Sequence, residues 1–200
     1  LVIVSGRVGS GVTSTLYSIL RSMDAYTQRL VTIESKPAAD MENVTQTAYG
    51  DPKKLVKALT AALRRDPDVI MIDACPDAET AGLIAQASAS KLVILGLGAV
   101  DTFMGLALWI KACGEGSSAG MANLRGVLCQ ALIRNLCPAC RQPYRPDPKL
   151  LAKANLTSSQ IERFYKAPEG QQLDEEGEPV ICPSCQGTGY IGRTGVFELL

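Results

Sequence analysis

The stretch that decides the fold is SGRVGSGVTSTLYSIL, residues 5–20. It matches the phosphate-binding loop pattern G-x-x-x-x-G-K-[ST] at Gly6, Gly11 and Thr13, but Val12 stands where the pattern has lysine. Backbone N–H groups of such a loop, together with the N-terminus of the following helix, form a cradle for an anion. The candidate nucleotide-binding residues are therefore Gly6, Gly9, Ser10, Gly11, Val12, Thr13 and Ser14.

Strands and helices are expected to alternate around this loop. Apolar runs predict strands at residues 1–5, 29–34, 68–73 and 91–97. Apolar residues at helical spacing predict helices at residues 13–23, 52–65 and 78–88, and residues 102–134 read as mainly helical with a break at 114–118. Asp77 is a candidate N-cap for the third helix. Because each strand is apolar on both faces, we expect an α/β fold whose mainly parallel sheet has helices on both sides.

The composition narrows the functional classes. Twenty basic and twenty acidic residues leave no net charge, which gives no support for nucleic acid as a partner. The sequence has no histidine, so the commonest general base and metal-binding nitrogen are both missing. No run of about 18 apolar residues and no export signal occur, so we expect a cytoplasmic protein. The chain begins in an apolar strand without an initiator Met, and we expect it to be a fragment of a longer protein.

Four of the seven cysteines form two CxxC pairs, Cys137 with Cys140 and Cys182 with Cys185. Two such pairs, 41 residues apart, are typical of a structural zinc site with four thiolate ligands. Two disulfides are the alternative, which a reducing compartment disfavours. The segment CPSCQGTG also matches the zinc repeat of J-domain chaperones, but those repeats occur in tandem and this chain has one copy.

The composition changes near residue 135. Residues 137–193 are rich in Pro, Gly, Cys and charge, with a polar helix-like piece around residues 158–165 and an acidic loop at residues 174–178. A segment this polar buries little apolar area, so the four cysteines are expected to stabilise it. We therefore predict a P-loop nucleotide-binding domain at residues 1–134, a four-cysteine zinc module at 135–193 and a return to the first domain at 194–200.

The order of motifs resembles the traffic ATPases of type II secretion and type IV pilus assembly. The matching pieces are GRVGSGVTSTLYSIL, VTIESKP, RRDPDVIMIDACPDAETA, GVLCQALIRNLCPAC and CPSCQGTGYIGRTGVFELL. The resemblance implies a RecA-like ATPase domain with a bound zinc ion. It also implies ring-forming secretion or pilus ATPase subunits as partners, and peripheral attachment to the cytoplasmic face of an inner-membrane platform.

Several positions depart from the chemistry of that family. The P-loop lysine is Val12, the aspartate after Glu34 is Ser35, and the glutamate after Asp73 is Ala74. The arginine after the same strand aligns with Pro76, and the two histidines of the family's His box align with Lys91 and Gly98. These positions contact phosphate, metal or water in the family, whereas scaffold motifs such as the CxxC pairs are retained. The pattern of losses therefore predicts impaired hydrolysis.

The leading hypothesis is a degenerate ATPase that acts as a structural or regulatory subunit and binds ATP or ADP weakly without hydrolysis. Thr13 and Asp73 are the residues expected to hold any accompanying Mg²⁺. One alternative is an active motor ATPase, whose catalysis would rely on Glu34, Asp73 and Thr13. The other is a zinc-stapled interaction module with an inert P-loop. Nucleotide affinity and turnover distinguish the three.

Overall fold

The computed structural model describes residues 1–156, 163–170, 172–173 and 179–200. The chain forms two compact units, residues 1–132 with 195–200 and residues 133–194. The expected acidic loop at residues 174–178 lies outside the described residues, as does most of the expected helix-like piece at 158–165. The end of that piece is not helical, because Phe164–Lys166 is a β-strand. In the part of the chain that is described, no helix is long and apolar enough to cross a membrane.

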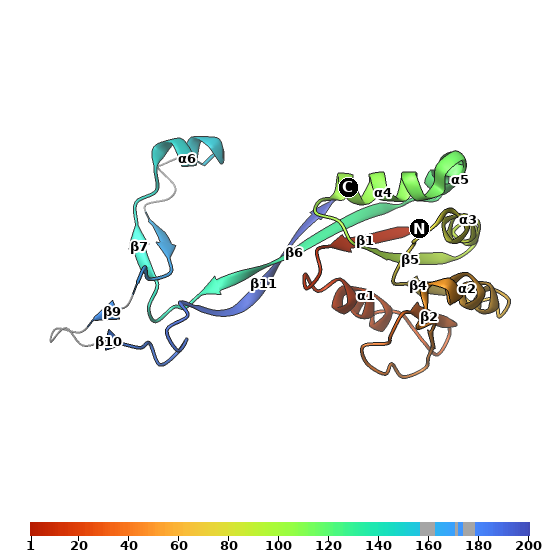
Figure 1. Ribbon diagram of the computed structural model, residues 1–200, viewed down its shortest axis with the longest axis horizontal. Coiled ribbons are helices and arrows are strands. Elements are labelled where there is room, and N and C mark those ends of the chain that lie inside the picture. Colours follow the sequence, from red (N-terminus) through yellow and green to blue (C-terminus); the bar gives the residue numbers. More distant parts are fainter. Residues whose placement is uncertain (157–162, 171, 174–178) are drawn as a thin grey trace. The chain divides into compact units, whose positions relative to one another are not determined.

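A seven-stranded sheet organises the first unit, in the order β11-β6-β1-β5-β4-β2-β3 (Figure 1). The strands are β1 (Val2–Gly6), β2 (Leu30–Glu34), β3 (Val44–Ala48), β4 (Val69–Ile72), β5 (Leu92–Leu97), β6 (Gly126–Leu136) and β11 (Tyr190–Leu199). From β6 to β3 in this order, each strand pairs in parallel with the next. At the β11 edge, Val127 and Leu200 exchange both backbone hydrogen bonds, which is the antiparallel pattern. The expected α/β fold with a mainly parallel sheet is confirmed.

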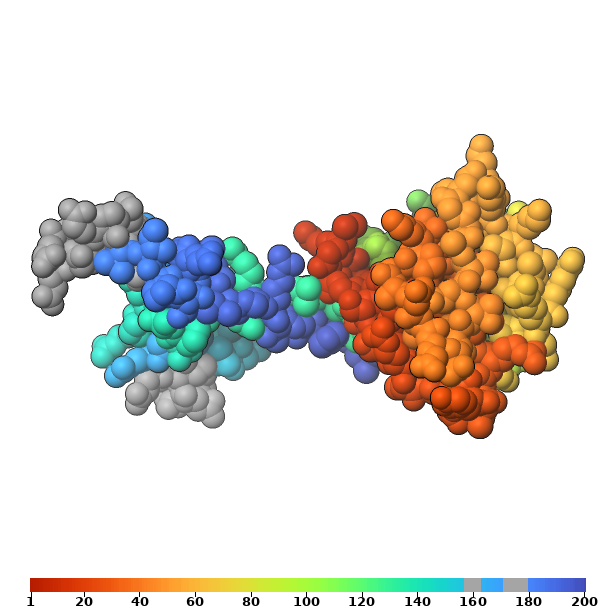
Figure 2. All heavy atoms as spheres, turned by 90° about the horizontal axis from the view of Figure 1, so that it is seen from below, coloured from red at the N-terminus to blue at the C-terminus, as the bar shows by residue number. Residues whose placement is uncertain are grey.

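Helices cover both faces of the sheet, because neighbouring residues of each strand point to opposite sides. On one side Ile3, Ile70 and Val93 pack with α2 (Leu55–Leu63), α3 (Ala78–Ala87) and α4 (Thr102–Cys113). On the other side Val4, Met71 and Ile94 pack with α1 (Val12–Arg21). Figure 1 shows α1 and α4 on opposite sides of β1. Segments from the start of the chain, red to orange, form most of the face of this unit seen in Figure 2.

Two strands differ from the sequence-based expectation. Residues 126–134 were expected to be helical, but they belong to β6, whose residues 126–130 pair with β1. The spacing of apolar residues in this segment fits either a helix or a strand. Pairing with a buried strand overrides the local helical preference. Strand β3, with sequence VTQTA, was not predicted because its alternating polar residues lack an apolar run. It forms the opposite edge of the sheet, where a strand needs less apolar burial.

The remaining helices of the first unit are short. A 3₁₀ turn at Pro52–Lys54 leads into α2, and a second at Gly114–Gly116 joins α4 to α5 (Ser117–Ala122). Trp109 of α4 is fully buried, and its Nε1–H donates to the Gly120 carbonyl at 3.1 Å. This bond fixes α4 against α5.

The second unit contains little regular structure. Strands β7 (Gln142–Tyr144) and β8 (Phe164–Lys166) pair antiparallel, as do β9 (Gln172–Leu173) and β10 (Pro179–Val180). One short helix, α6, spans Pro148–Lys153. Three of its cysteines and Leu151 are buried. The cysteines thus form the main buried cluster among the described residues of this unit.

The predicted N-cap of α3 is confirmed and can be tested. The Asp77 carboxylate accepts the Thr80 N–H at 2.8 Å, which satisfies a donor of the first helical turn. Replacing it (Asp77→Ala) should lower the free energy of unfolding by about 1 kcal/mol, measured by chemical denaturation. Asp40→Ala is the control, because it removes the same charge from an exposed loop. Equal destabilisation by both changes would contradict the capping role.

Candidate functional site

The loop between β1 and α1 has the backbone shape of a phosphate cradle. Gly9 and Gly11 adopt φ angles of +81° and +90°, a left-handed conformation that favours glycine. Helix α1 begins directly afterwards at Val12, and no described side chain caps its N-terminus. The N–H groups of the first turn are therefore available to an anion, and the helix dipole places partial positive charge there.

A pocket of about 570 Å³ lies at this loop. Its lining residues are Gly6, Arg7, Val8, Gly9, Gly11, Val12, Thr13, Ser14, Asp73, Gly96, Leu97 and Leu132. The structure thus places six of the seven candidate nucleotide-binding residues around one pocket. The seventh, Ser10, is buried behind the loop. Arg7 and Asp73 are the charged residues of the lining, and Val12 is half-buried and also packs against the core beneath α1.

A glutamine from the neighbouring strand holds the loop from behind. Gln130 of β6 is buried and lies beside Gly6 in register, and its Nε2–H donates to the Ser10 carbonyl at 2.8 Å. A Cβ added to Gly6 would lie 2.7 Å from the Gln130 carbonyl oxygen and 2.2 Å from Ser10 Oγ. Glycine is therefore required at this position. Ser10 Oγ and Gln130 Oε1 are buried without a partner among the described residues.

Asp73, which follows β4, is half-buried, and each of its carboxylate oxygens accepts a hydrogen bond. Tyr49 donates its hydroxyl to Oδ1 at 2.8 Å, and the Ser35 backbone N–H donates to Oδ2 at 2.6 Å. Burial raises the pKa of Asp73, although the hydrogen bonds from Ser35 and Tyr49 oppose that change. Burial and the bond to Asp73 raise the pKa of Tyr49, so the phenol stays protonated and acts as the donor.

Glu34, the other candidate carboxylate, is not among the residues that line the pocket. Its side chain is 2% exposed. Its Oε2 accepts the Tyr17 hydroxyl at 2.7 Å, and its Oε1 accepts the Thr32 hydroxyl at 2.7 Å. Burial and the bond to Glu34 raise the pKa of Tyr17. The structure therefore gives different surroundings to the two carboxylates that the sequence grouped together. Asp73 reaches the pocket, while Glu34 ties α1 to β2 inside the protein.

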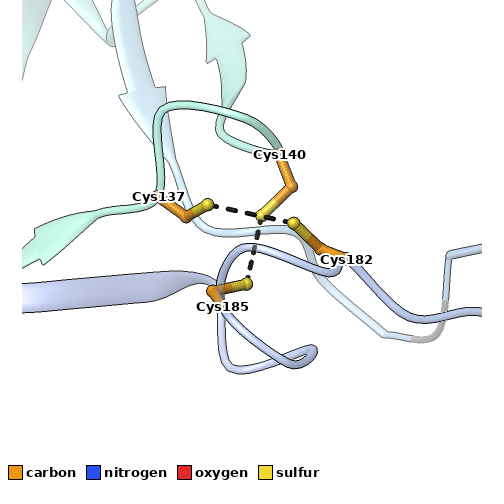
Figure 3. A group of neighbouring side chains, drawn as sticks. All are labelled: Cys137, Cys140, Cys182 and Cys185. Atoms are coloured by element: carbon orange, nitrogen blue, oxygen red, sulfur yellow. Dashed lines mark hydrogen bonds between the residues drawn. The ribbon is translucent and has the colours of Figure 1, made fainter.

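The four CxxC cysteines form a second candidate site, in the second unit (Figure 3). Their sulfur atoms all lie within 4.8 Å of one another, with Cys137 and Cys182 at 3.9 Å and Cys140 and Cys185 at 3.6 Å. Tetrahedral coordination with metal–sulfur distances of about 2.3 Å separates the sulfurs by about 3.8 Å. All four thiols are free in the structure rather than paired as disulfides. The cluster could hold a metal ion.

Local backbone geometry builds this cluster. Gln186, Gly187 and Gly189 have positive φ angles, so the chain turns tightly after CPSC. The Gly189 N–H donates to the Cys185 sulfur at 3.2 Å, and the Cys137 N–H donates to the Gly189 carbonyl at 2.9 Å. Residue 189 therefore links the two CxxC turns.

The thiols of the cluster differ in acidity. Burial would raise the pKa of Cys185, but the N–H of Gly189 and the neighbouring thiols donate to its sulfur and lower that pKa to about 6. Burial, together with the bond to Cys185, raises the pKa of Cys140 to about 12. The cluster thus favours a thiolate at Cys185, and a thiolate is the form that binds metal.

Comparison with known proteins identifies the family. The sequence profile described as "Type II/IV secretion system protein" matches residues 1–200, the whole chain. The chain belongs to the type II/IV secretion system protein family. It is 30% identical over 202 residues to "Type II secretion system ATPase E" of Vibrio cholerae and 35% identical over 204 residues to "Type II secretion system protein E" of Klebsiella pneumoniae. Each alignment covers 100% of this chain and 38% of the relative, so the chain spans less than half of their length.

Solved structures show the same fold. The Legionella pneumophila ATPase DotB superposes with a TM-score of 0.60 at 23% identity, over 66% of this chain and 41% of DotB. The pilus retraction motor PilT, solved with ADP, superposes with a TM-score of 0.59 at 24% identity, over 68% of this chain and 43% of PilT. The sequence-based recognition of the secretion family is therefore confirmed, as is the fold class.

Two residues that position parts of the candidate site were not identified from the sequence. One holds the β1–α1 loop and the other holds Asp73. Gln130 lay in a segment expected to be helical, although a single amide inside the apolar run VLCQAL was an available signal. Tyr49 follows the unpredicted strand β3, and nothing in its local sequence indicates Asp73 as its partner. Both contacts join residues far apart in the chain, which only the strand order brings together.

The Gln130 contact predicts a loss of stability. Gln130→Met keeps the size of the side chain but leaves the buried Ser10 carbonyl without its donor, so the free energy of unfolding should fall by about 1–3 kcal/mol. Chemical denaturation measures the change, with the exposed Gln28→Met as the matched control. Similar stability of the two variants would show that another donor serves the Ser10 carbonyl.

Proposed function

We propose that this chain is a degenerate ATPase of the secretion family, a structural or regulatory subunit that binds nucleotide weakly without hydrolysing it. The observation that carries the proposal is the pocket at the β1–α1 loop. It retains the glycine backbone and the uncapped helix N-terminus, but Val12 occupies the lysine position. The backbone N–H groups of this loop and of the first turn of α1 would hold the phosphates.

Hydrolysis requires charge compensation that this pocket lacks. Removing one preorganised donor to the developing charge costs about 3 kcal/mol of transition-state stabilisation, and losing a general base costs about 10²–10⁴ in rate. Ala74 presents a methyl group where relatives of the traffic ATPase type would carry a carboxylate. Glu34 offers no substitute, because both of its oxygens accept internal hydrogen bonds and it does not line the pocket. Arg7 is the cationic side chain of the lining.

The oxygen atoms that would hold a Mg²⁺ ion with the nucleotide belong to Thr13 and Asp73. Both residues line the pocket, and Mg²⁺ prefers hydroxyl, carboxylate and phosphate oxygens. When bound, the ion would offset part of the phosphate charge. Each oxygen of Asp73 already accepts one hydrogen bond, from Tyr49 or from Ser35, so a bound ion would have to share this carboxylate with those donors.

The cysteine cluster is proposed to hold one structural Zn²⁺. Four sulfur ligands at tetrahedral spacing leave no open coordination position, which is the mark of a structural rather than a catalytic site. The second unit has little other buried apolar surface among its described residues, so metal binding would supply much of its folding energy.

The names of the relatives support a proposal about the setting in which the protein acts. Those most similar in sequence are named as type II secretion proteins, and one is named as an ATPase. We therefore propose that the chain acts with ring-forming secretion or pilus ATPase subunits, at the cytoplasmic face of an inner-membrane platform. Nucleic acid is not proposed as a partner, since the chain has no net positive charge.

Nucleotide binding and turnover test the main proposal. The wild-type chain should bind ADP weakly and release no appreciable phosphate from ATP. Val12→Lys alone should not restore hydrolysis, because Ala74 still lacks a carboxylate. Val12→Lys with Ala74→Glu should raise the rate by more than the sum of the single changes, because phosphate positioning and water activation act in the same step.

Two results would contradict the proposal in different ways. Wild-type turnover on the order of 1 s⁻¹ or more, lost in Asp73→Asn, would identify an active motor. Absence of any nucleotide binding would identify an interaction module with an inert loop. Phosphate-release assays and calorimetric titration separate these outcomes.

Metal analysis tests the zinc site. The purified chain should contain about one zinc per molecule, and Cys182→Ser should lose the metal together with the structure of the second unit. Cys113→Ser is the matched control, because Cys113 lies in the first unit, outside the cluster. A chain with both CxxC pairs oxidised in reducing buffer, and with little zinc by elemental analysis, would overturn the proposal.

A further inference from the structure

Both oxygens of the carboxylate that lines the phosphate pocket already accept a hydrogen bond from the protein. Asp73 lines the pocket, yet its Oδ1 accepts the Tyr49 hydroxyl and its Oδ2 accepts the Ser35 N–H. At 2.8 and 2.6 Å, both bonds are within or below the usual range of hydrogen-bond lengths. Each oxygen keeps a second lone pair, but the two donors placed by the fold fix the direction in which the carboxylate can offer it.

These donors are fixed by the sheet rather than by flexible side chains alone. Tyr49 follows edge strand β3; its backbone N–H donates to the Glu34 carbonyl at 2.9 Å, and the residue is 8% exposed. The next residue, Gly50, donates to the Ser35 carbonyl at 3.1 Å, and the Asp73 N–H donates to the Ile33 carbonyl at 3.2 Å. The ends of β2, β3 and β4 are thus joined by backbone bonds. A buried phenol also needs a partner, and Asp73 supplies it.

We propose, on the basis of the nucleotide binding proposed above, that Tyr49 holds Asp73 as an internal hydrogen-bond acceptor and thereby makes phosphate binding at this loop nearly independent of Mg²⁺. A Mg²⁺ ion demands near-ideal octahedral geometry and keeps several of its waters, so a carboxylate serves it only when its lone pairs can turn toward the ion or those waters. Rotation of Asp73 for that purpose breaks the bond to Tyr49 and leaves a buried hydroxyl unpaired.

No second carboxylate compensates among the residues that line the pocket. Glu34 lies in the interior and is bound to Tyr17 and Thr32. Position 35 is serine, and it contributes a backbone donor to Asp73 rather than a carboxylate. The groups left to meet phosphate charge are Arg7, the hydroxyls of Thr13 and Ser14, and the backbone N–H groups.

The ligand class follows from this set of groups. Without an ammonium at Val12 or a firmly held metal, each additional phosphate brings charge that the pocket compensates poorly beside an apolar side chain. The site is therefore suited to a metal-free nucleoside diphosphate in preference to a triphosphate.

Calorimetric titration of ADP into the intact chain, with Mg²⁺ and then with EDTA in its place, tests the inference. The wild-type dissociation constants should agree within about twofold. In Tyr49→Phe the ring remains, but Oδ1 of Asp73 is free, so Mg²⁺ should tighten ADP binding by about tenfold. The double variant Tyr49→Phe with Asp73→Asn should lose this gain. Tyr26→Phe, at a tyrosine that is 86% exposed, is the matched control and should behave like wild type.

The opposing results are distinct. Wild-type binding that Mg²⁺ strengthens tenfold or more, with the effect lost in Asp73→Asn, would overturn this inference and leave the proposed nucleotide binding intact. A folded Tyr49→Phe variant that ignores Mg²⁺ would overturn the role of Tyr49. No ADP binding by wild type in either buffer would overturn the proposed function and this inference together. The wild-type comparison depends on no variant, so misfolding of Tyr49→Phe would not remove the test.

Discussion

The parallel pairing of β1 with β5 on one side and β6 on the other is the constraint on which the candidate site depends. Parallel strands bring their carboxyl ends to one edge of the sheet, and ligands of open α/β sheets bind at that edge. The loop after β1, Gly96 and Leu97 at the end of β5, and Asp73 after β4 therefore meet at one pocket. Gln130 reaches the loop from β6 for the same reason.

The features that could be read from the sequence are those encoded within a few residues. The glycines of the loop need left-handed φ angles, and the CxxC turns bring two thiols together locally, so both motifs predicted their geometry. Strand β6 could not be read in this way, because its apolar residues fit a helix until β1 is available as a partner. Gln130 was missed along with it. The spacing of apolar residues can be read from a short stretch of sequence. Where that spacing fits both a helix and a strand, pairing with other parts of the fold decides between them.

Glu34 and Asp73 show where residue type alone stops being informative. Glu34 is the last residue of apolar strand β2, and Asp73 comes directly after apolar strand β4 of the same sheet. Both were candidates for the same chemistry. Tyr17 on α1 and Tyr49 after β3 determine their surroundings, and neither tyrosine is near its carboxylate in the sequence. One carboxylate becomes an internal tie and the other a pocket residue with both oxygens engaged. Their environments, and hence their available roles, were set by packing that a single sequence does not reveal.

The shape of the phosphate loop does not depend on the residue at position 12. Glycine conformations, the close approach of Gly6 to β6 and the Gln130 bond to Ser10 define its backbone, while Val12 packs its side chain against the core beneath α1. A lysine at that position would serve the bound phosphates rather than the fold. Loss of its charge is therefore compatible with an intact sheet, loop and helix, because the interactions that build the cradle are separate from those that would make it catalytic.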